Sequence, residues 1–161
     1  MSDQAFLARA IALALEAEAA GNLPIGALIV LEGQIIAEGR NALLQPHYQP
    51  GAHGEMEALR RVPPQLWPRA AAMTCYSTLE PCLMCYGSLL LHGVGRIVFG
   101  AHDPEGGASC IQAHLPPYYP AVAPVPRWEG PLLPERCDAL YQRARAHFIA
   151  LPCGGSHADS H

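Results

Sequence analysis

His53-Gly54-Glu55 and Pro81-Cys82-Leu83-Met84-Cys85 are the two stretches that decide how this chain of 161 residues is organised. Imidazole and thiolate are zinc ligands, and a catalytic zinc site commonly has three protein ligands and leaves a fourth position for water. Zinc lowers the pKa of such a water towards neutrality and makes it nucleophilic. The stretches therefore predict a zinc site formed by His53, Cys82 and Cys85, with Glu55 as a proton carrier that does not bind the metal.

Each of these stretches stands at the start of a predicted helix, over residues 53–62 and 82–92. Pro63-Pro64 ends the first of these helices. The partial positive charge at a helix start favours the thiolate form of cysteine. A spacing of three residues also places the sulfurs of Cys82 and Cys85 on one side of the helix. The helix starts therefore predict that the two segments deliver their ligands to one place.

The rest of the chain alternates between helical and strand patterns. Leu7, Ile11 and Leu15 mark one face of a helix, and Glu32-Gly33 predicts the turn of a hairpin. The remaining predicted elements are helices over 4–20, 108–115 and 134–149, and strands over 24–31, 34–38, 72–78, 97–101 and 125–129. This order predicts an α/β fold with helices on both faces of a sheet.

Residues 1–149 are predicted to form a single domain, because no internal repeat or linker divides the chain. Residues 150–161 are predicted to form a flexible C-terminal tail. The N-terminus lacks the positive stretch of a signal peptide, and no apolar run approaches the roughly 18 residues that a bilayer requires. The closely spaced cysteine pair fits metal binding in a reducing compartment. We therefore expect a cytoplasmic protein without a membrane segment.

The charge of the chain bears on its partners. The formal net charge is −4, and all ten basic residues are arginines. A general nucleic-acid binder usually carries a basic excess or a clustered basic stripe. The composition shows no such excess, although a total does not exclude a local arginine patch.

Two other uses of the cysteine pair are weighed against catalytic zinc. A structural zinc site needs four ligands, and the other candidates, Cys75, Cys110 and His102, lack paired spacing. A thioredoxin-like redox pair would leave the histidine and glutamate of the first stretch unexplained. Catalytic zinc accounts for both stretches and is the favoured prediction.

A histidine and glutamate separated by one residue, followed by Pro-Cys-x-x-Cys, form the signature of zinc nucleobase deaminases. Over about residues 5–149 the chain resembles the cytidine/deoxycytidylate deaminase superfamily. The sequence around the metal-binding motifs resembles that of the bacterial tRNA adenosine deaminases most closely, and guanine and cytosine deaminases share much of this sequence. The segments that carry this resemblance are Pro24-Ile25-Gly26-Ala27, Asn41, Thr78-Leu79-Glu80-Pro81-Cys82-Leu83-Met84-Cys85 and Gly95-Arg96-Ile97-Val98-Phe99-Gly100-Ala101.

The resemblance implies a three-layer α/β/α fold with a five-stranded mixed sheet, and a homodimer or higher assembly. It implies that His53, Cys82 and Cys85 bind Zn²⁺ and that Glu55 is the proton shuttle. It also assigns Asn41 to a hydrogen bond with the base, a role that suits the donor and acceptor of a loop amide. The alternative role of Asn41 is that of a turn residue.

Three further residues are candidates for substrate contact. The backbone N–H at Gly54 or Glu55 is implied as a donor to the ring, and Gly54 stands where the tRNA enzymes usually carry alanine. Tyr86 follows the second cysteine and either lines the pocket or packs behind its helix. Guanine deaminases place a second catalytic aspartate beyond the fourth strand, but this chain has no aspartate between Asp103 and Asp138. Asp103 or Glu105 is the candidate substitute, and turn formation is the favoured role of both.

The substrate prediction follows from charge. The segment from His102 to Gly107 lacks the basic residues usual in the tRNA enzymes, and phosphate contacts supply much of the affinity for nucleic acid. The first prediction is therefore hydrolytic deamination, with release of ammonia, of a free base such as cytosine, guanine or a related aminated pyrimidine or triazine. The second is adenosine-to-inosine deamination of tRNA. The third is a catalytically silent zinc protein that serves as a dimer partner, which an intact Glu55 opposes.

Overall fold

The computed structural model describes residues 1–150, so the predicted tail lies, apart from its first residue, outside the described part. No helix within that part is long and apolar enough to cross a membrane. The elements, in chain order, are α1 (Asp3–Ala19), β1 (Gly26–Leu31), β2 (Gln34–Arg40), α2 (Gly54–Arg60), η1 (Pro64–Ala72), β3 (Met73–Leu79), α3 (Leu83–Leu91), β4 (Arg96–Ala101), η2 (Ser109–His114), α4 (Tyr118–Val122), β5 (Arg127–Glu129) and α5 (Pro134–Ala150).

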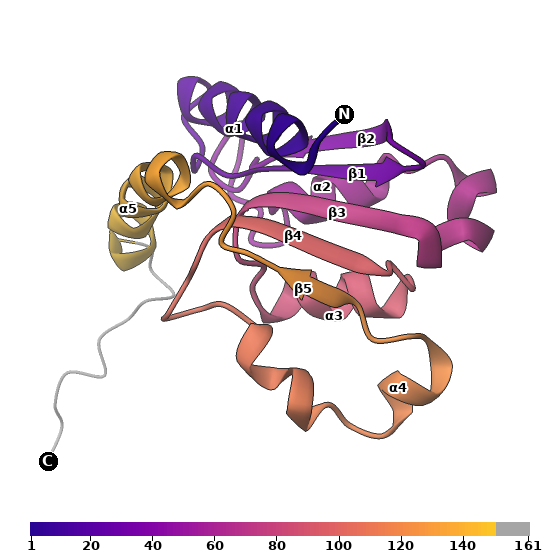
Figure 1. The fold of residues 1–161 in the computed structure, drawn as a ribbon. Coiled ribbons are helices and arrows are strands. Elements are labelled where there is room, and N and C mark those ends of the chain that lie inside the picture. Colours follow the sequence, from indigo (N-terminus) through magenta and orange to yellow (C-terminus); the bar gives the residue numbers. More distant parts are fainter. Residues whose placement is uncertain (151–161) are drawn as a thin grey trace, which may run out of the picture.

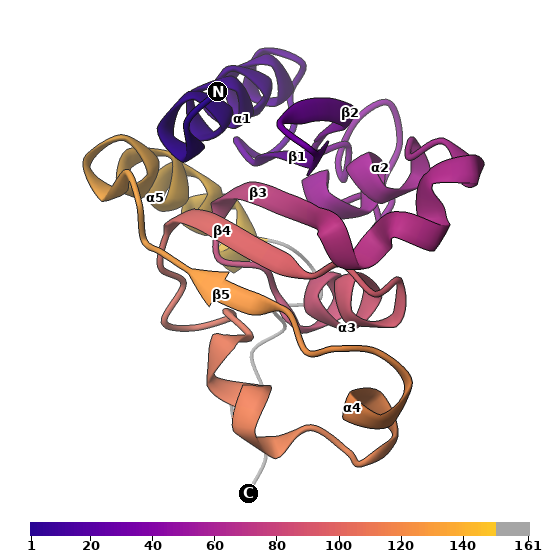
Figure 2. The same ribbon diagram turned by 45° about the vertical axis from the view of Figure 1, so that its right-hand side comes forward.

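The five strands form one sheet in the order β2-β1-β3-β4-β5. The pairings of β1 with β2 and with β3 are antiparallel, whereas those of β4 with β3 and with β5 are parallel. Helices α1 and α5 cover one face of the sheet, and α2 and α3 cover the other (Figures 1 and 2). This arrangement confirms the three-layer α/β/α fold and the mixed sheet expected from the sequence.

Strand β1 is buried on both faces. Ala27, Ile29 and Leu31 pack in the cluster that includes α2 and α3. Leu28 and Val30 pack in the cluster formed with α1. Successive side chains of a strand point to opposite faces, so a central strand between two helical layers carries apolar residues at every position.

Helix α2 lies unusually close to β2. A Cβ atom on Gly39 would lie 2.1 Å from the carbonyl oxygen of Gly54 and 2.3 Å from the backbone nitrogen of Ala58. Only glycine permits such an approach of helix and strand backbones. Gly39 therefore fixes the position of the first turn of α2 against the sheet.

Helix α2 ends before Pro63-Pro64, as predicted. The 3-10 helix η1, which begins at Pro64 and contains Pro68, was not predicted. Proline is tolerated in the first turn of a helix, where its missing N–H would have no partner. The short helix α4 also lies in a Pro-rich segment and was not predicted.

Candidate metal centre

Three ligand-type side chains meet where two helices begin. His53 is the N-cap residue of α2, Cys82 is the N-cap residue of α3, and Cys85 lies in the first turn of α3. The Nδ1 atom of His53 lies 3.5 Å from the Sγ atom of Cys82 and 3.6 Å from that of Cys85. Tetrahedral zinc with ordinary Zn–N and Zn–S bond lengths separates such atoms by about 3.6 Å. The spacing of the three atoms therefore fits a zinc ion.

The composition of the cluster distinguishes an open site from a closed one. Among residues 1–150, His53, Cys82 and Cys85 form the group whose ligand atoms all lie within 4.8 Å of one another. Cys75 and Cys110, two candidates for a fourth ligand, are not members of this group. Three protein ligands with a free fourth position are typical of catalytic zinc.

The pKa values of the three ligand side chains depend on one another. The hydrogen bond from Cys85, followed by that from His53, lowers the pKa of Cys82 to about 4. The interaction with Cys82, together with burial, holds the pKa of Cys85 well above its ordinary value. Burial acts to lower the pKa of His53, but the hydrogen bond with Cys82 and the charge of Glu55 raise it overall. Zinc binding therefore displaces protons from these ligands.

Glu55 is a buried carboxylate beside the ligands. The hydroxyl of Ser77 donates to its Oε1 atom at 2.8 Å, and its Oε2 atom lies 3.4 Å from the sulfur of Cys85. Burial raises the pKa of Glu55, as is common for carboxylates that move protons near neutral pH. The role of Ser77 was not predicted, although a hydroxyl in the apolar strand β3 was a visible signal.

A cavity of about 240 Å³ opens beside the metal ligands. One wall comes from the loop after β4, and another comes from α5. The lining residues are His53, Cys82, Asp103, Glu105, Gly106, Tyr141, Arg145 and Phe148. The sequence predicted α5 as a helix but gave no indication that it contributes to the site.

The oxygen and the nitrogen of the Asn41 side-chain amide differ in their hydrogen bonding. Its side chain is buried, and its Oδ1 atom accepts from the N–H groups of Leu23 and Leu43. Its Nδ2 atom is buried without a hydrogen-bond partner. These bonds leave the amide donor unused. Asn41 lines a separate cavity with Asn22, Glu57 and Arg61, and not the cavity beside the metal ligands, so its contact with a substrate stays a prediction.

The other predicted substrate residues lie in different settings. Tyr86 packs edge-on against Trp128 with ring centroids 5.0 Å apart, and it lines a separate cavity behind α3. Asp103 lines the metal-side cavity, but its Oδ1 atom accepts from the hydroxyl of Tyr141 and from two N–H groups of its own turn. Gly54 is buried at the first position of α2, and its role in substrate binding stays a prediction.

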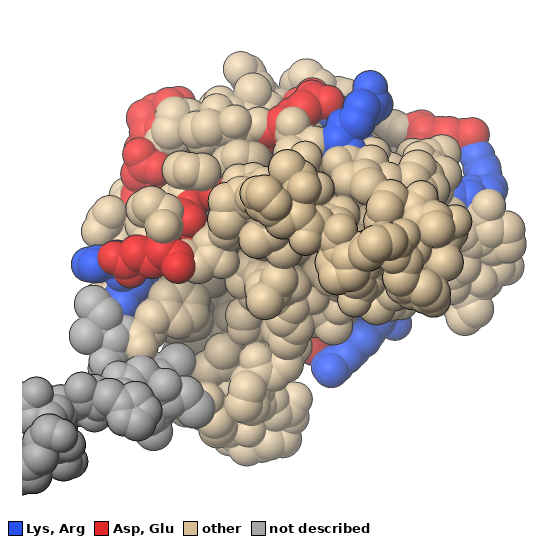
Figure 3. All heavy atoms as spheres, turned by 90° about the horizontal axis from the view of Figure 1, so that it is seen from below, with Lys and Arg blue, Asp and Glu red and all other residues tan. Residues whose placement is uncertain are grey.

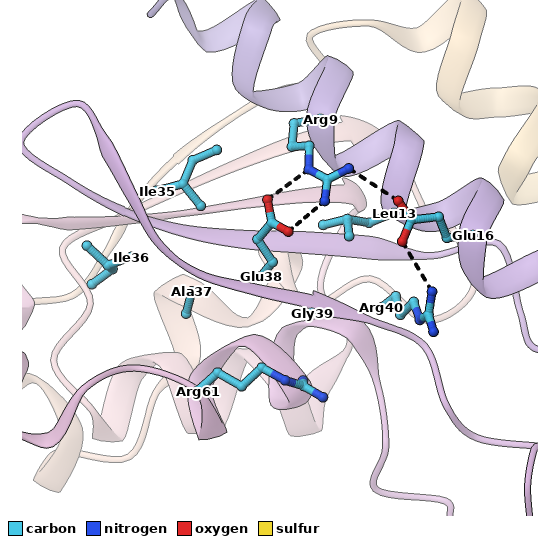
Figure 4. A pocket seen from close by; sticks show the side chains of 10 residues that line it. All are labelled: Arg9, Leu13, Glu16, Ile35, Ile36, Ala37, Glu38, Gly39, Arg40 and Arg61. Carbon is cyan, nitrogen blue, oxygen red and sulfur yellow. Dashed lines mark hydrogen bonds and ion pairs between the residues drawn. The ribbon is translucent and has the colours of Figure 1, made fainter.

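A larger groove of about 620 Å³ runs along the exposed edge of the sheet, between α1 and β2 (Figure 4). Arg9 binds Glu38 and Glu16 there, and Arg40 also binds Glu16. None of the metal ligands lines this groove. Charged side chains that satisfy one another protect an edge strand from pairing with other chains, and we assign the groove that role.

The chain was compared with known proteins. Residues 1–101 match the family model of the cytidine and deoxycytidylate deaminase zinc-binding region. The tRNA-specific adenosine deaminase of Bacillus subtilis is 42% identical over 109 residues, which are 66% of each chain. The enzyme of the same name from Haemophilus influenzae is 41% identical over 115 residues, 70% of this chain and 66% of the relative. The match therefore spans just under two thirds of the length of these relatives.

Solved structures extend the likeness to the C-terminal part. A structure from a study of A-to-I editing by tRNA:A34 deaminases superimposes with a TM-score of 0.74 and 28% identity, covering 85% of this chain and 99% of that one. Guanine deaminase from Nitrosomonas europaea superimposes with a TM-score of 0.70 and 20% identity, covering 89% of this chain and 85% of that one, which shows a shared fold. The family match includes the three zinc ligands and Glu55. This chain belongs to the cytidine and deoxycytidylate deaminase family.

Proposed function

We propose that this protein is a zinc-dependent hydrolytic deaminase whose substrate is an adenosine of tRNA. The observation that carries the reaction is the three-ligand cluster with the buried carboxylate of Glu55 beside it. The substrate is supported by relatives named tRNA-specific adenosine deaminase, which share 41–42% of aligned residues. The relatives thus favour the second substrate predicted from the sequence over the first.

The ligands, Glu55 and Ser77 have separate roles in the proposed reaction. When bound at His53, Cys82 and Cys85, zinc supplies the Lewis acidity that makes water nucleophilic near neutral pH. Glu55 accepts one proton from the attacking water and delivers it to the ring nitrogen, and then transfers the remaining proton of the added hydroxyl to the leaving amine. The oxygen of the water bonds to the ring carbon, the C–N bond breaks, and ammonia leaves a carbonyl behind. Ser77 holds one oxygen of Glu55, so that the other faces the cluster.

A second candidate substrate, a free nucleobase, is favoured by the state of the arginines. Eight of the ten arginines form ion pairs with carboxylates. Arginines neutralised in this way are poor phosphate ligands, and phosphate contacts supply much of the affinity for RNA. A free base needs no phosphate contact, and a cavity of about 240 Å³ admits a ring system without its backbone.

A parallel assay distinguishes these substrates. Zinc-loaded protein is incubated with free bases, with their nucleosides and with unmodified tRNA, and both ammonia and inosine are measured. We expect inosine in the tRNA and no turnover of the bases. Turnover of a free base with the tRNA unchanged would mean that the substrate is a free nucleobase and not tRNA. A zinc-loaded protein that turns over none of them would contradict the deaminase proposal.

The face around α3 supports the proposal of a homodimer. Residues 81–95 and 106–126 contain no acidic residue, lysine or arginine. Leu83, Met84 and Leu91 of α3 are exposed, and Figure 3 shows a broad uncharged surface on this side of the molecule. An uncharged apolar face can pack against its own copy across a two-fold axis, because no like charges are opposed there. We therefore propose a second copy of this chain as the occupant of this face.

Leu91→Glu is expected to convert the dimer to a monomer, because the two-fold axis would bring two buried carboxylates together. Analytical ultracentrifugation of the zinc-loaded protein measures the mass. Leu15→Glu is the matched control. Leu15 has a similar exposed fraction, 48% against 57% for Leu91, but it lies on α1. A Leu91→Glu protein that keeps the mass of a dimer, or a monomeric native protein, would refute this interface.

A further inference from the structure

Glu80 is a buried carboxylate outside the metal cluster and outside the lining of the cavity. It lies between the end of β3 and the zinc ligand Cys82, and its side chain is 1% exposed. A carboxylate so deeply buried is costly unless several donors surround it. The donors therefore show what this residue holds in place.

All the donors to Glu80 come from one segment, residues 102–109. Its Oε2 atom accepts from the N–H of Asp103 at 3.1 Å and lies 2.5 Å from Nδ1 of His102. Its Oε1 atom accepts from the N–H of Ser109 at 3.0 Å. One carboxylate thus binds both ends of the segment.

The middle of the segment is also closely fitted around Glu80. A Cβ atom on Gly107 would lie 2.3 Å from the carboxyl carbon of Glu80. Gly107 forms an isolated β-bridge with Cys82, and the N–H of Ala108 donates to the carbonyl of Pro81 at 3.0 Å. These contacts tie the segment to Pro81 and to the zinc ligand Cys82.

This segment forms one wall of the substrate cavity. Asp103, Glu105 and Gly106 line that cavity together with the metal ligands His53 and Cys82. Helix α5 is attached to the same wall, because the hydroxyl of Tyr141 donates to Asp103 at 3.1 Å and Arg145 binds Glu105 at 2.6 Å. A displacement of the segment would move both walls together.

We infer that Glu80 is a positioning residue that fixes the wall formed by residues 102–109 at a set distance from the zinc ligands and so determines how the substrate ring is held. The kinetic consequence rests on the proposed deaminase activity. The claim that Glu80 holds the segment in place does not rest on that activity, because hydrogen exchange of the N–H groups of Asp103 and Ser109 measures it directly.

Glu80→Gln tests this inference with little change of shape. The amide keeps one acceptor oxygen but places an NH₂ group against a backbone N–H, so one end of the segment is released. We expect unchanged zinc content, a KM raised by about tenfold and a kcat within about threefold of the native value. Glu38→Gln is the control, because Glu38 is a hydrogen-bonded carboxylate remote from the cavity, and it should leave KM unchanged.

Amide hydrogen exchange gives a readout independent of activity. The N–H groups of Asp103 and Ser109 are expected to exchange slowly in the native protein and at least about tenfold faster, for one or both, in Glu80→Gln. Fast exchange in the native protein, or folded Glu80→Gln with native exchange and native KM, would overturn the inference. If Glu80→Gln does not fold, Gly107→Ala displaces the same segment with Glu80 intact, and a native KM in that folded variant overturns the inference. A native protein without turnover would refute the proposed function alone.

Discussion

Glu55→Gln is expected to yield a folded, zinc-loaded protein whose rate of ammonia release is lower by about 10²–10⁴. The amide has the shape of the carboxylate and can still accept from Ser77, but it cannot take a proton from water. Thermal stability should not fall, because the native protein buries an ionisable group there at a cost. Zinc content by mass spectrometry and single-turnover deamination measure the two expectations separately.

Glu57→Gln is the matched control for this variant. Glu57 lies on the same helix, and its carboxylate binds Arg60 and Arg61 rather than the metal cluster. It should retain nearly native turnover, since its partners Arg60 and Arg61 are exposed and ion pairs with exposed arginines contribute little. Persistent deamination by Glu55→Gln would remove Glu55 from the proposed mechanism, and loss of zinc in that variant would mean that its carboxylate is needed to hold the metal.

His53→Ala is expected to lower zinc content from about one ion per chain to below about a tenth, and to abolish turnover. His53 supplies the one nitrogen of the cluster, 3.5 and 3.6 Å from the two sulfurs. It makes no side-chain capping bond to α2, so its removal should leave the helix formed. The variant should also melt at a lower temperature than the zinc-loaded native protein, because bound metal stabilises only the folded state.

His92→Ala controls for the loss of an imidazole elsewhere. His92 is the C-cap residue of α3, and its ring contacts the carbonyl of Ser88 rather than the cluster. It should keep full zinc content and activity. Full zinc occupancy in His53→Ala, measured after removal of loosely bound metal, would disprove the assignment of the ligands.

The metal centre was predictable because its parts are local. His53 and Glu55 are two residues apart, Cys82 and Cys85 are three apart, and each pair is oriented by the helix that it begins. The hairpin at Glu32-Gly33 was predictable for the same reason, since a glycine with positive φ lies between two apolar runs.

The remaining parts of the site depend on distant contacts and were not predictable. Tyr141 and Arg145 reach the cavity only because α5 packs against β3 and β4, about sixty residues beyond Cys82 in the chain. Helical periodicity identifies α5 and its buried face but not the neighbour that this face meets. The helix η1 was missed because prolines end helices in some positions and begin them in others.

Net charge and the named relatives point to different substrates. The total of −4 indicated weak binding of nucleic acid, whereas the relatives that match the site are named as tRNA deaminases. The structure adds to this difference, because eight of the ten arginines are already bound to carboxylates. Binding of RNA would have to exchange such pairs for phosphate contacts, at a cost that depends on each pair.

The cavity is built from two lengths of chain. The ligands and Glu55 belong to residues 1–101, which match the family model, whereas the walls from the loop after β4 and from α5 lie beyond it. The residues proposed to carry the reaction therefore lie in one part of the chain, and much of the cavity wall lies in another. A substitution at Tyr141 or Phe148 alters that wall without replacing a ligand or Glu55, so the shape of the cavity and the proposed chemistry can be varied separately by mutation.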